Sequence, residues 1–198
     1  MRGSSLKIYG ITAALLIGAL LLSCGGEKHT PKPRGYYRID LLDKSYQTFD
    51  TTYPYKFEYP TYGETEFLER KGEQYWMNLN FPRYNATVYL SYKQVNNNLP
   101  ELIEDSHKMS FDHSVKADDI VSSVFINGDA KVYGMFIEVE GDAASPVQFY
   151  VTDSTRNFLR GSLYFYSSPN RDSLNPLIEY FEEDIRHLME TIEWKHPK

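Results

Sequence analysis

The side chains best suited to chemistry are spread along the chain and form no established motif. His107 and His113 are near neighbours in sequence, but their separation is not the i, i+4 spacing that places two metal ligands on one helical face. We interpret them as partly exposed residues at a helix end, where histidine interacts favourably with the helix dipole. The chain also lacks a nucleophile elbow, a phosphate-binding glycine loop and paired cysteines. The sequence therefore predicts no metal site, no cofactor and no enzyme.

Two acidic stretches have the residue types for cation binding or general base catalysis. Asp118 and Asp119 are adjacent, so in an extended chain their side chains point to opposite sides. A second acidic run at 182–184 is followed by Arg186 and His187. Mixed charges of this kind are typical of the wet face of an amphipathic helix. We therefore expect both stretches to be solvated.

An enzyme or small-ligand binder stays open as the alternative, because catalytic residues often lie far apart in sequence. Its candidates are Asp118, Asp153 and Arg160, and it predicts a deep pocket that unites several of them. Aromatic residues make up 15% of the chain and could form a recognition face, although we favour core filling. The tyrosines considered for such a face are Tyr89, Tyr92, Tyr150, Tyr164 and Tyr166.

The N-terminal residues resemble a bacterial lipoprotein signal. Arg2 and Lys7 precede an uncharged apolar stretch, 8–22, which is shorter than a typical membrane span. The stretch runs into Leu21-Leu22-Ser23-Cys24, a lipobox in which a small residue precedes the only cysteine of the chain. The sequence therefore predicts a cleaved signal peptide at 1–23.

Lipidation would make Cys24 the mature N-terminus and hold the protein on a membrane. We expect the polar residues 24–35, which contain prolines, to form a linker, and 36–198 to form a single globular domain. Removal of the signal takes away two positive charges and no negative one, so the net charge changes from −6 to −8. This acidic balance argues against a nucleic-acid partner, which requires a basic surface.

Periodicity indicates the elements that position these residues. The continuous apolar middle of 131–140 predicts a central strand buried on both faces. The sequence as a whole predicts an α+β fold, a mostly antiparallel sheet of about six or seven strands packed by two main helices. The order of elements resembles the Mog1/PsbP-type α/β/α sandwich. The predicted strands are 55–60, 63–70, 76–82, 86–92, 123–126, 131–140, 148–153 and 158–166, and the helices run from 99 to about 111 and from Ser173 or Asn175 to about 191.

An ordered series of short stretches resembles the gliding motility lipoprotein GldD family of the Bacteroidetes. Each stretch is weak alone, but together they span nearly the whole chain after the signal. They are PKPRG (31–35), FEYP (57–60), WMNL (76–79), ATVYLSY (86–92), NNNL (96–99), VKAD (115–118), YG (133–134), GDAAS (141–145), QFYVTDS (148–154), GSLYF (161–165) and DIRHLMET (184–191).

The resemblance implies a lipid-anchored accessory protein of the gliding motility and type IX secretion machinery in the cell envelope. It also implies that the domain faces the periplasm, acts through protein–protein contacts and has a GldE-like membrane protein as a companion. No catalytic residues come with the resemblance. The envelope ligand binder, for a glycan or lipid, remains the alternative.

Two sets of surface residues complete the candidates. The loop of Asn96, Asn97 and Asn98 breaks a strand before a helix, and we predict that it contacts a partner. Three Asp-Ser/Thr sites resemble the O-glycosylation sites of exported Bacteroidetes proteins, although the same residues favour Asx turns or helix caps. Their acceptor residues are Thr51, Ser154 and Ser173.

Overall fold

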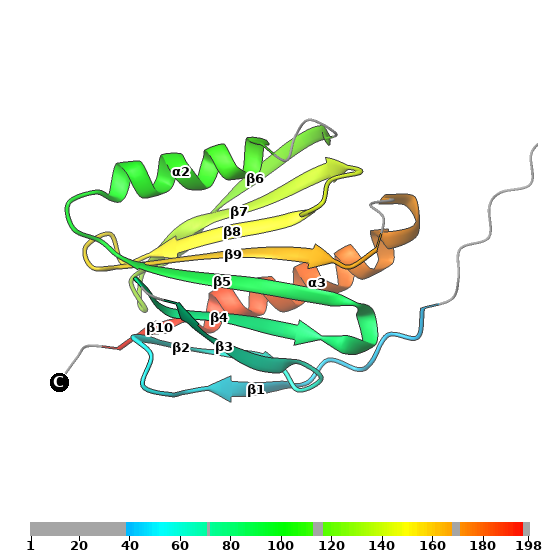
Figure 1. Ribbon diagram of the computed structural model, residues 1–198, viewed down its shortest axis with the longest axis horizontal. Helices are drawn as coiled ribbons and strands as arrows, with labels where there is room; N and C mark the ends of the chain where they lie inside the picture. The colour runs from blue at the N-terminus through cyan, green and yellow to red at the C-terminus, as the bar shows by residue number, and fades with distance from the viewer. Residues whose placement is uncertain (1–38, 71, 113–116, 168–170, 196–198) are drawn as a thin grey trace, which may run out of the picture. The chain divides into compact units, whose positions relative to one another are not determined.

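A computed structural model describes residues 39–70, 72–112, 117–167 and 171–195 (Figure 1). These residues all belong to one unit, Tyr37–Lys198, of the two into which the chain divides. The predictions for the signal peptide at 1–23, Cys24, the linker at 24–35 and His113 lie outside the described residues. Within the described part, no helix is long and apolar enough to cross a membrane.

The main element is a seven-stranded sheet whose neighbouring strands all run antiparallel, in the order β3-β4-β5-β9-β8-β7-β6. A second sheet has three strands in the order β1-β2-β10. Among the described residues, two α-helices and a short 3₁₀ helix complete the fold, which confirms the predicted α+β class. The elements are β1 (Tyr46–Phe49), β2 (Tyr55–Pro60), β3 (Glu64–Arg70), β4 (Glu73–Phe81), η1 (Pro82–Tyr84), β5 (Ala86–Gln94), α2 (Leu99–Asp112), β6 (Ala117–Asn127), β7 (Val132–Gly141), β8 (Val147–Thr152), β9 (Asn157–Phe165), α3 (Arg171–Thr191) and β10 (Glu193–Trp194).

Strand β8 shows how the layers are arranged, because both of its faces are buried. Phe149 and Val151 belong to the core cluster that includes α3. Tyr150, on the alternate face, packs with Leu102 of α2. The two helices therefore cover opposite faces of the large sheet, α2 at the top of Figure 1 and α3 behind it.

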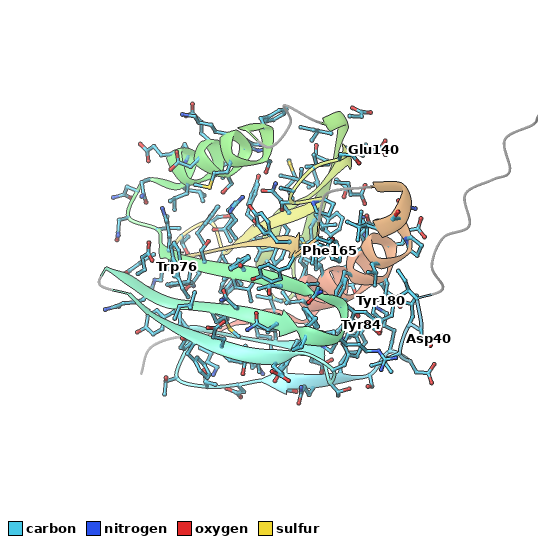
Figure 2. All side chains as sticks on the ribbon, turned by 45° about the vertical axis from the view of Figure 1, so that its right-hand side comes forward. Asp40, Trp76, Tyr84, Glu140, Phe165 and Tyr180 are labelled. Carbon is cyan, nitrogen blue, oxygen red and sulfur yellow. The ribbon has the colours of Figure 1, made fainter. Side chains whose placement is uncertain are left out.

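The main core lies between the large sheet, α3 and the small sheet. Phe181 of α3 is fully buried, and its ring centroid is 4.8 Å from that of Phe81 and 5.9 Å from that of Phe165. Tyr84 and Tyr180 close one end of this core with ring centroids 5.6 Å apart. Figure 2 shows these two tyrosines beside each other near Asp40, with Trp76 at the other side of the molecule.

The sequence was wrong about which strand is central. The predicted central strand corresponds to β7, but β7 lies between β8 and the edge strand β6. Tyr133 of β7 is 36% exposed, whereas all six residues of β8 are buried. The reason is that β6 is the last strand and α2 covers β8 and β9, so part of β7 faces solvent.

The interpretation of 182–184 as a wet helix face was also wrong for Asp184, which is only 3% exposed. The carboxylate forms an ion pair of 2.7 Å with Lys44 and accepts hydrogen bonds from Tyr46 and Tyr62. The segment before β1 covers this part of α3, because the main chain of Leu42 is hydrogen-bonded to tyrosines at the end of the core. Helical periodicity alone gives no sign of a covering segment that lies far away in sequence.

Candidate functional site

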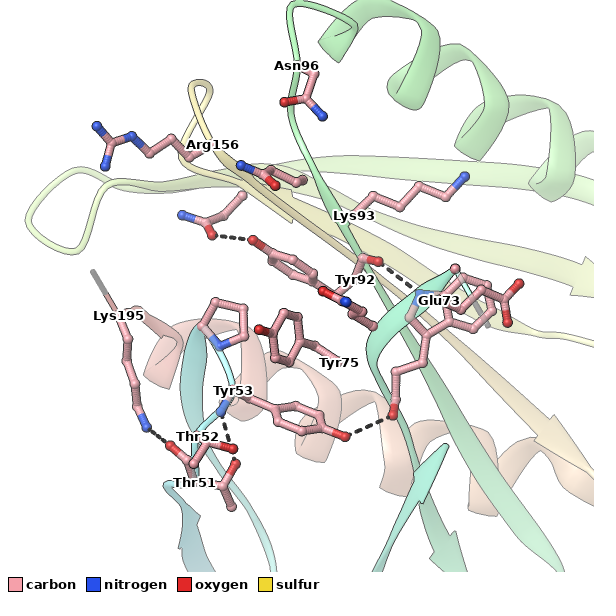
Figure 3. A pocket seen from close by; sticks show the side chains of 16 residues that line it. Thr51, Thr52, Tyr53, Glu73, Tyr75, Tyr92, Lys93, Asn96, Arg156 and Lys195 are labelled. Atoms are coloured by element: carbon pink, nitrogen blue, oxygen red, sulfur yellow. Dashed lines mark hydrogen bonds between the residues drawn. The ribbon is translucent and has the colours of Figure 1, made fainter. Parts of the chain in front are cut away.

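A hollow with a volume of about 1050 Å³ opens at one end of the large sheet (Figure 3). We call it the tyrosine cleft. Its walls come from the loop between the first two strands, the β3–β4 hairpin, the end of β5, the β8–β9 hairpin and the residue after β10. The lining residues are 51–54, 72–76, 92–94, Asn96, Arg156, Asn157 and Lys195.

Three tyrosine rings form the centre of the cleft, and Figure 3 shows them following one another through the hollow. The ring of Tyr75 makes edge-to-face contacts with Tyr53 and Tyr92, at centroid distances of 5.3 and 5.7 Å. Such edge-to-face pairs contribute stabilising free energy in addition to that from the burial of their apolar surface. The three rings therefore support one another although they come from a loop, a hairpin and a strand.

Hydrogen bonds hold the aromatic side chains in place. The Tyr92 hydroxyl donates to Asn157 Oδ1 at 2.7 Å, and the Trp76 indole N–H donates to the Tyr92 carbonyl at 2.9 Å. The Tyr53 hydroxyl donates to the Trp76 carbonyl at 3.2 Å. Burial, with a smaller contribution from the charge of Asp153, raises the pKa of Tyr92 to about 12. Tyr92 is therefore neutral at physiological pH and serves as a hydrogen-bond donor.

Tyr75 occupies an unusual backbone conformation for its residue type. Its φ angle is 64°, in the left-handed region that disfavours side chains with a Cβ. The Tyr55 hydroxyl donates to the Tyr75 carbonyl at 2.7 Å, which helps to hold this conformation. The result is an aromatic side chain that is 37% exposed at the cleft. Strained residues of this kind cluster at functional sites, although strain alone does not identify a function.

Three cationic side chains, Lys93, Arg156 and Lys195, line the cleft together with one carboxylate, that of Glu73. Lys195 forms an ion pair with Asp50 and also donates to the Thr51 carbonyl, and the hydrogen bond from Lys195 lowers the pKa of Asp50. Lys93 and Arg156 are exposed and form no ion pair with another described residue. The cleft thus combines aromatic surface with two cationic side chains that a partner can reach.

The predicted partner loop borders this cleft. Asn96 lines it, and the main-chain N–H of Asn96 donates to Asn98 Oδ1 at 2.8 Å. Asn97 has a φ angle of 59°, and the Asn98 carbonyl accepts the first helical bond of α2 from Leu102. The loop therefore has a structural role as well, because it turns the chain from β5 into α2. Its contact with a partner remains a prediction.

The three predicted glycosylation acceptors are exposed but lie in different places. Thr51 lines the tyrosine cleft, Ser154 lies in the β8–β9 hairpin and Ser173 lies in the first turn of α3. At Ser154 the alternative interpretation, an Asx turn, has direct support. Asp153 Oδ1 accepts main-chain hydrogen bonds from the three residues 155–157. Glycosylation of these residues remains a prediction.

The tyrosines considered from sequence do not share one face. Tyr92 lines the cleft, whereas Tyr150 packs beneath α2. Tyr89 and Tyr166 meet through their hydroxyls at 2.6 Å on the face of the sheet away from the main core. The cleft residues Tyr53 and Tyr75 were missed, because Tyr53 lies in a loop and Tyr75, although part of β4, precedes the predicted strand 76–82. The alternating aromatic residues of 53–59 were the only indication in the sequence that tyrosine rings gather here.

The polar residues proposed for an enzyme are not brought together. Asp118 lies in the edge strand β6, and two further strands separate it from β9, which carries Arg160. Asp153 lies in the β8–β9 hairpin, with its carboxylate used by that loop. His107 makes an edge contact with the Tyr150 ring at 5.8 Å. Within the described part of the chain, no group of three metal-ligating side chains occurs.

Comparisons with known proteins identify a family for this chain. No curated protein matches the chain. Among solved structures, the chain is similar to the solution structure of cyanobacterial PsbP (CyanoP) from Synechocystis sp. PCC 6803, with 9% sequence identity, a TM-score of 0.48 and coverage of 80% of this chain and 97% of that chain. The family model described as gliding motility lipoprotein GldD matches residues 26–194.

Proposed function

The chain belongs to the gliding motility lipoprotein GldD family, and from this membership we propose that it is an accessory protein of the gliding motility and type IX secretion machinery that acts by binding another protein. In this proposal Cys24 carries the lipid anchor and the domain faces the periplasm. The partner is a membrane protein of the machinery, such as a GldE-like protein. The lipobox before Cys24 supports the anchor.

The observation that carries the proposal is the chemistry of the tyrosine cleft. The hydroxyls of Tyr53 and Tyr92 already donate within the protein, so a partner meets mainly the aromatic faces. Tyrosine and arginine are enriched at the centres of protein interfaces, and aromatic side chains lose little conformational entropy on binding. Tyr75 and Arg156 are such residues at the surface of the cleft. Because the rings are held in place, less ordering is needed when a partner binds.

The test is crosslinking and affinity purification of the full chain from native envelopes. Tyr75→Asn removes the exposed ring, and asparagine tolerates the left-handed conformation that this position requires. Tyr133→Asn is the matched control, because Tyr133 on β7 is 36% exposed, close to the 37% of Tyr75. We expect Tyr75→Asn to lower recovery of a motility or secretion membrane protein by about tenfold or more, as for an interface hot spot.

The anchor is tested separately with Cys24→Ala, which should abolish recovery of the membrane partner. Equal recovery with Tyr75→Asn and Tyr133→Asn would contradict binding through the cleft. Recovery of a glycan or lipid in place of any protein would favour the alternative, an envelope small-ligand binder.

A further inference from the structure

A second hollow of about 420 Å³ lies between α2 and the large sheet. Its volume falls within the range of small-molecule sites, about 300–1,000 Å³. It exists because α2 contacts β8 and β9 and leaves the neighbouring part of the sheet face uncovered. We call it the α2 groove, and the residues that matter are Trp76, Asn78, Ser91, Leu102, Met109 and Arg160.

Arg160 is the more buried of two cations that line the α2 groove, the other being the exposed Lys93. Arg160 is half-buried, and its Nη2 donates to Gln148 Oε1 at 2.5 Å. It forms no ion pair with another described residue, although Asp105 lines the same groove. Desolvation lowers the pKa of Arg160. Partial burial of a cation without an anion is costly, so the missing partner is a group that a ligand can supply.

Asn78 gives an independent indication of a ligand. The residue lines the groove and is only 7% exposed, yet its Oδ1 has no hydrogen-bond partner. The amide orientation is fixed because its Nδ2 donates to Glu66 at 2.9 Å. Oδ1 therefore needs a donor, and an unsatisfied buried acceptor is rare in folded proteins. A hydroxyl on a bound molecule meets this need.

The strand register places these two groups near each other. Asn78 is paired with Tyr89 of β5, and Ser91, two positions further along β5, is paired with Arg160 of β9. The two side chains thus lie diagonally across β5 on the same face of the sheet. One small molecule can reach both.

The remaining wall of the groove is apolar. Trp76 of β4 and Met109 of α2 line it, and Met109 is 43% exposed. Leu102 and Phe158 close the floor as members of the small hydrophobic cluster beneath α2. Burial against such a wall is most favourable for a hydrocarbon chain, because the whole surface of the chain is apolar.

We propose that the α2 groove binds a hydroxylated carboxylic acid with a hydrocarbon chain. The carboxylate pairs with Arg160, whose planar guanidinium matches its two oxygens. The hydroxyl donates to Asn78 Oδ1, and the chain lies against Trp76, Leu102 and Met109. This site is distinct from the tyrosine cleft of the proposed function, and neither proposal depends on the other.

The test is photocrosslinking of the full chain in nanodiscs of zwitterionic lipid. The probe is 3-hydroxydecanoate with a photoreactive group at the chain end, and the labelled peptides are identified by mass spectrometry. We expect labelling of segments from β4, β5 and α2. The methyl ester of the probe, which lacks the charge, should label these segments at least about tenfold less, as expected for the loss of a hydrogen-bonded charge pair. Decanoate, which lacks the hydroxyl, should label them several-fold less.

Two variants connect the labelling to the groove. Arg160→Met should abolish it, while Arg156→Met, the same change in the tyrosine cleft, should leave it unchanged. Ser91→Phe should also abolish it by filling the space beside Arg160, which covers the case in which Arg160→Met does not fold. We expect Arg160→Met to unfold at an unchanged or higher temperature, since it removes a half-buried charge that has no anionic partner.

Other results would overturn the proposal. Equal labelling by the acid and its methyl ester would show that no anion site exists. Undiminished labelling of Arg160→Met would do the same. Competition by acetate as effective as competition by decanoate would show a site for a small anion, without the hydrocarbon part.

Discussion

At the scale of single residues, Lys44 and Asp184 form an ion pair in which the carboxylate is buried, with only 3% of its side chain exposed. Lys44 Nζ lies 2.7 Å from Asp184 Oδ1, donates to the Tyr180 carbonyl at 2.6 Å and lies 3.4 Å from the centre of the Tyr180 ring. Desolvation raises the pKa of Asp184 although Lys44 and Tyr62 lower it. Lys44 therefore favours the ionised form of the buried Asp184 carboxylate.

We predict that Lys44→Met destabilises the protein by about 3–5 kcal/mol, the usual cost of leaving one member of a buried pair uncompensated. Urea unfolding of the purified protein measures it. Lys56→Met is the matched control, because Lys56 pairs at 2.9 Å with Glu193, which is largely exposed, and this variant should unfold at the wild-type urea concentration. Similar losses for the two variants would show that burial of Asp184 has no energetic role.

Asp153 gives a prediction about pH. Partial burial raises its pKa, but hydrogen bonds from the main-chain N–H groups of 155–157 and from the Asn157 side chain together lower it below the ordinary value of 3.8. A lowered pKa in the folded state means that the carboxylate stabilises the fold above pH 3.8, and that this contribution is lost as the pH falls through the folded-state pKa.

We therefore expect Asp153→Asn to lower the free energy of unfolding at neutral pH by about 1 kcal/mol, a modest value because solvent screens a partly exposed carboxylate. The difference from wild type should shrink as the pH falls below 3.8. Urea midpoints measured from neutral to acidic pH test it. A difference that is constant over this range would mean that the charge of Asp153 contributes nothing.

At the scale of elements, the close approach of β7 and β8 depends on Gly134. A Cβ at this position would lie 1.9 Å from the main-chain carbonyl oxygen of Tyr150, and main chain within a sheet cannot move aside easily. We expect Gly134→Ala to destabilise the protein by about 1–3 kcal/mol, as overpacking does, with thermal unfolding as the measurement. Gly128→Ala in the adjoining turn meets nothing within 4 Å and is the control. An unchanged unfolding temperature for Gly134→Ala would show that β7 and β8 can separate locally.

The positions of helices and strands could be predicted from the sequence where one face of the element is buried, because burial gives the sequence a readable period. Helix α2 begins at the predicted Leu99, and β5 begins at the predicted Ala86. The short strands β1 and β10 were not predicted, because four and two residues carry no readable period. Their pairing with β2 forms a separate sheet that depends on contacts between the two ends of the domain.

The candidate sites were less predictable than the elements. Asn96 and Thr51 were identified as surface residues, but nothing in the sequence places them on one cleft with Tyr75. Arg160 was identified only as a polar residue within a strand. The significance of Arg160 comes from the position of α2, which is set by Leu102 against Tyr150 and Phe158. Sites assembled from loops and neighbouring elements require tertiary contacts that no local pattern contains.

At the scale of the whole molecule, the two hollows share one wall. Trp76 lines both the tyrosine cleft and the α2 groove, and its indole N–H donates to the Tyr92 carbonyl at 2.9 Å. Tyr75 lines only the cleft and Arg160 only the groove. A change at Trp76 therefore reaches both sites, whereas changes at the other two residues are confined to one.

We predict that Trp76→Leu lowers both partner recovery and probe labelling by about tenfold or more, since an aromatic wall is lost from each hollow. Tyr75→Asn should lower only partner recovery, and Arg160→Met only labelling. The same nanodisc preparation and the same envelope purification measure the two effects, with the unfolding temperature of each variant confirming that it is folded.

If Trp76→Leu folds and changes only one of the two measurements, Trp76 serves a single site and the hollows are functionally separate. If Arg160→Met also lowers partner recovery, ligand occupancy of the groove and partner binding are coupled, and by linkage the partner must then change the affinity of the groove for its ligand.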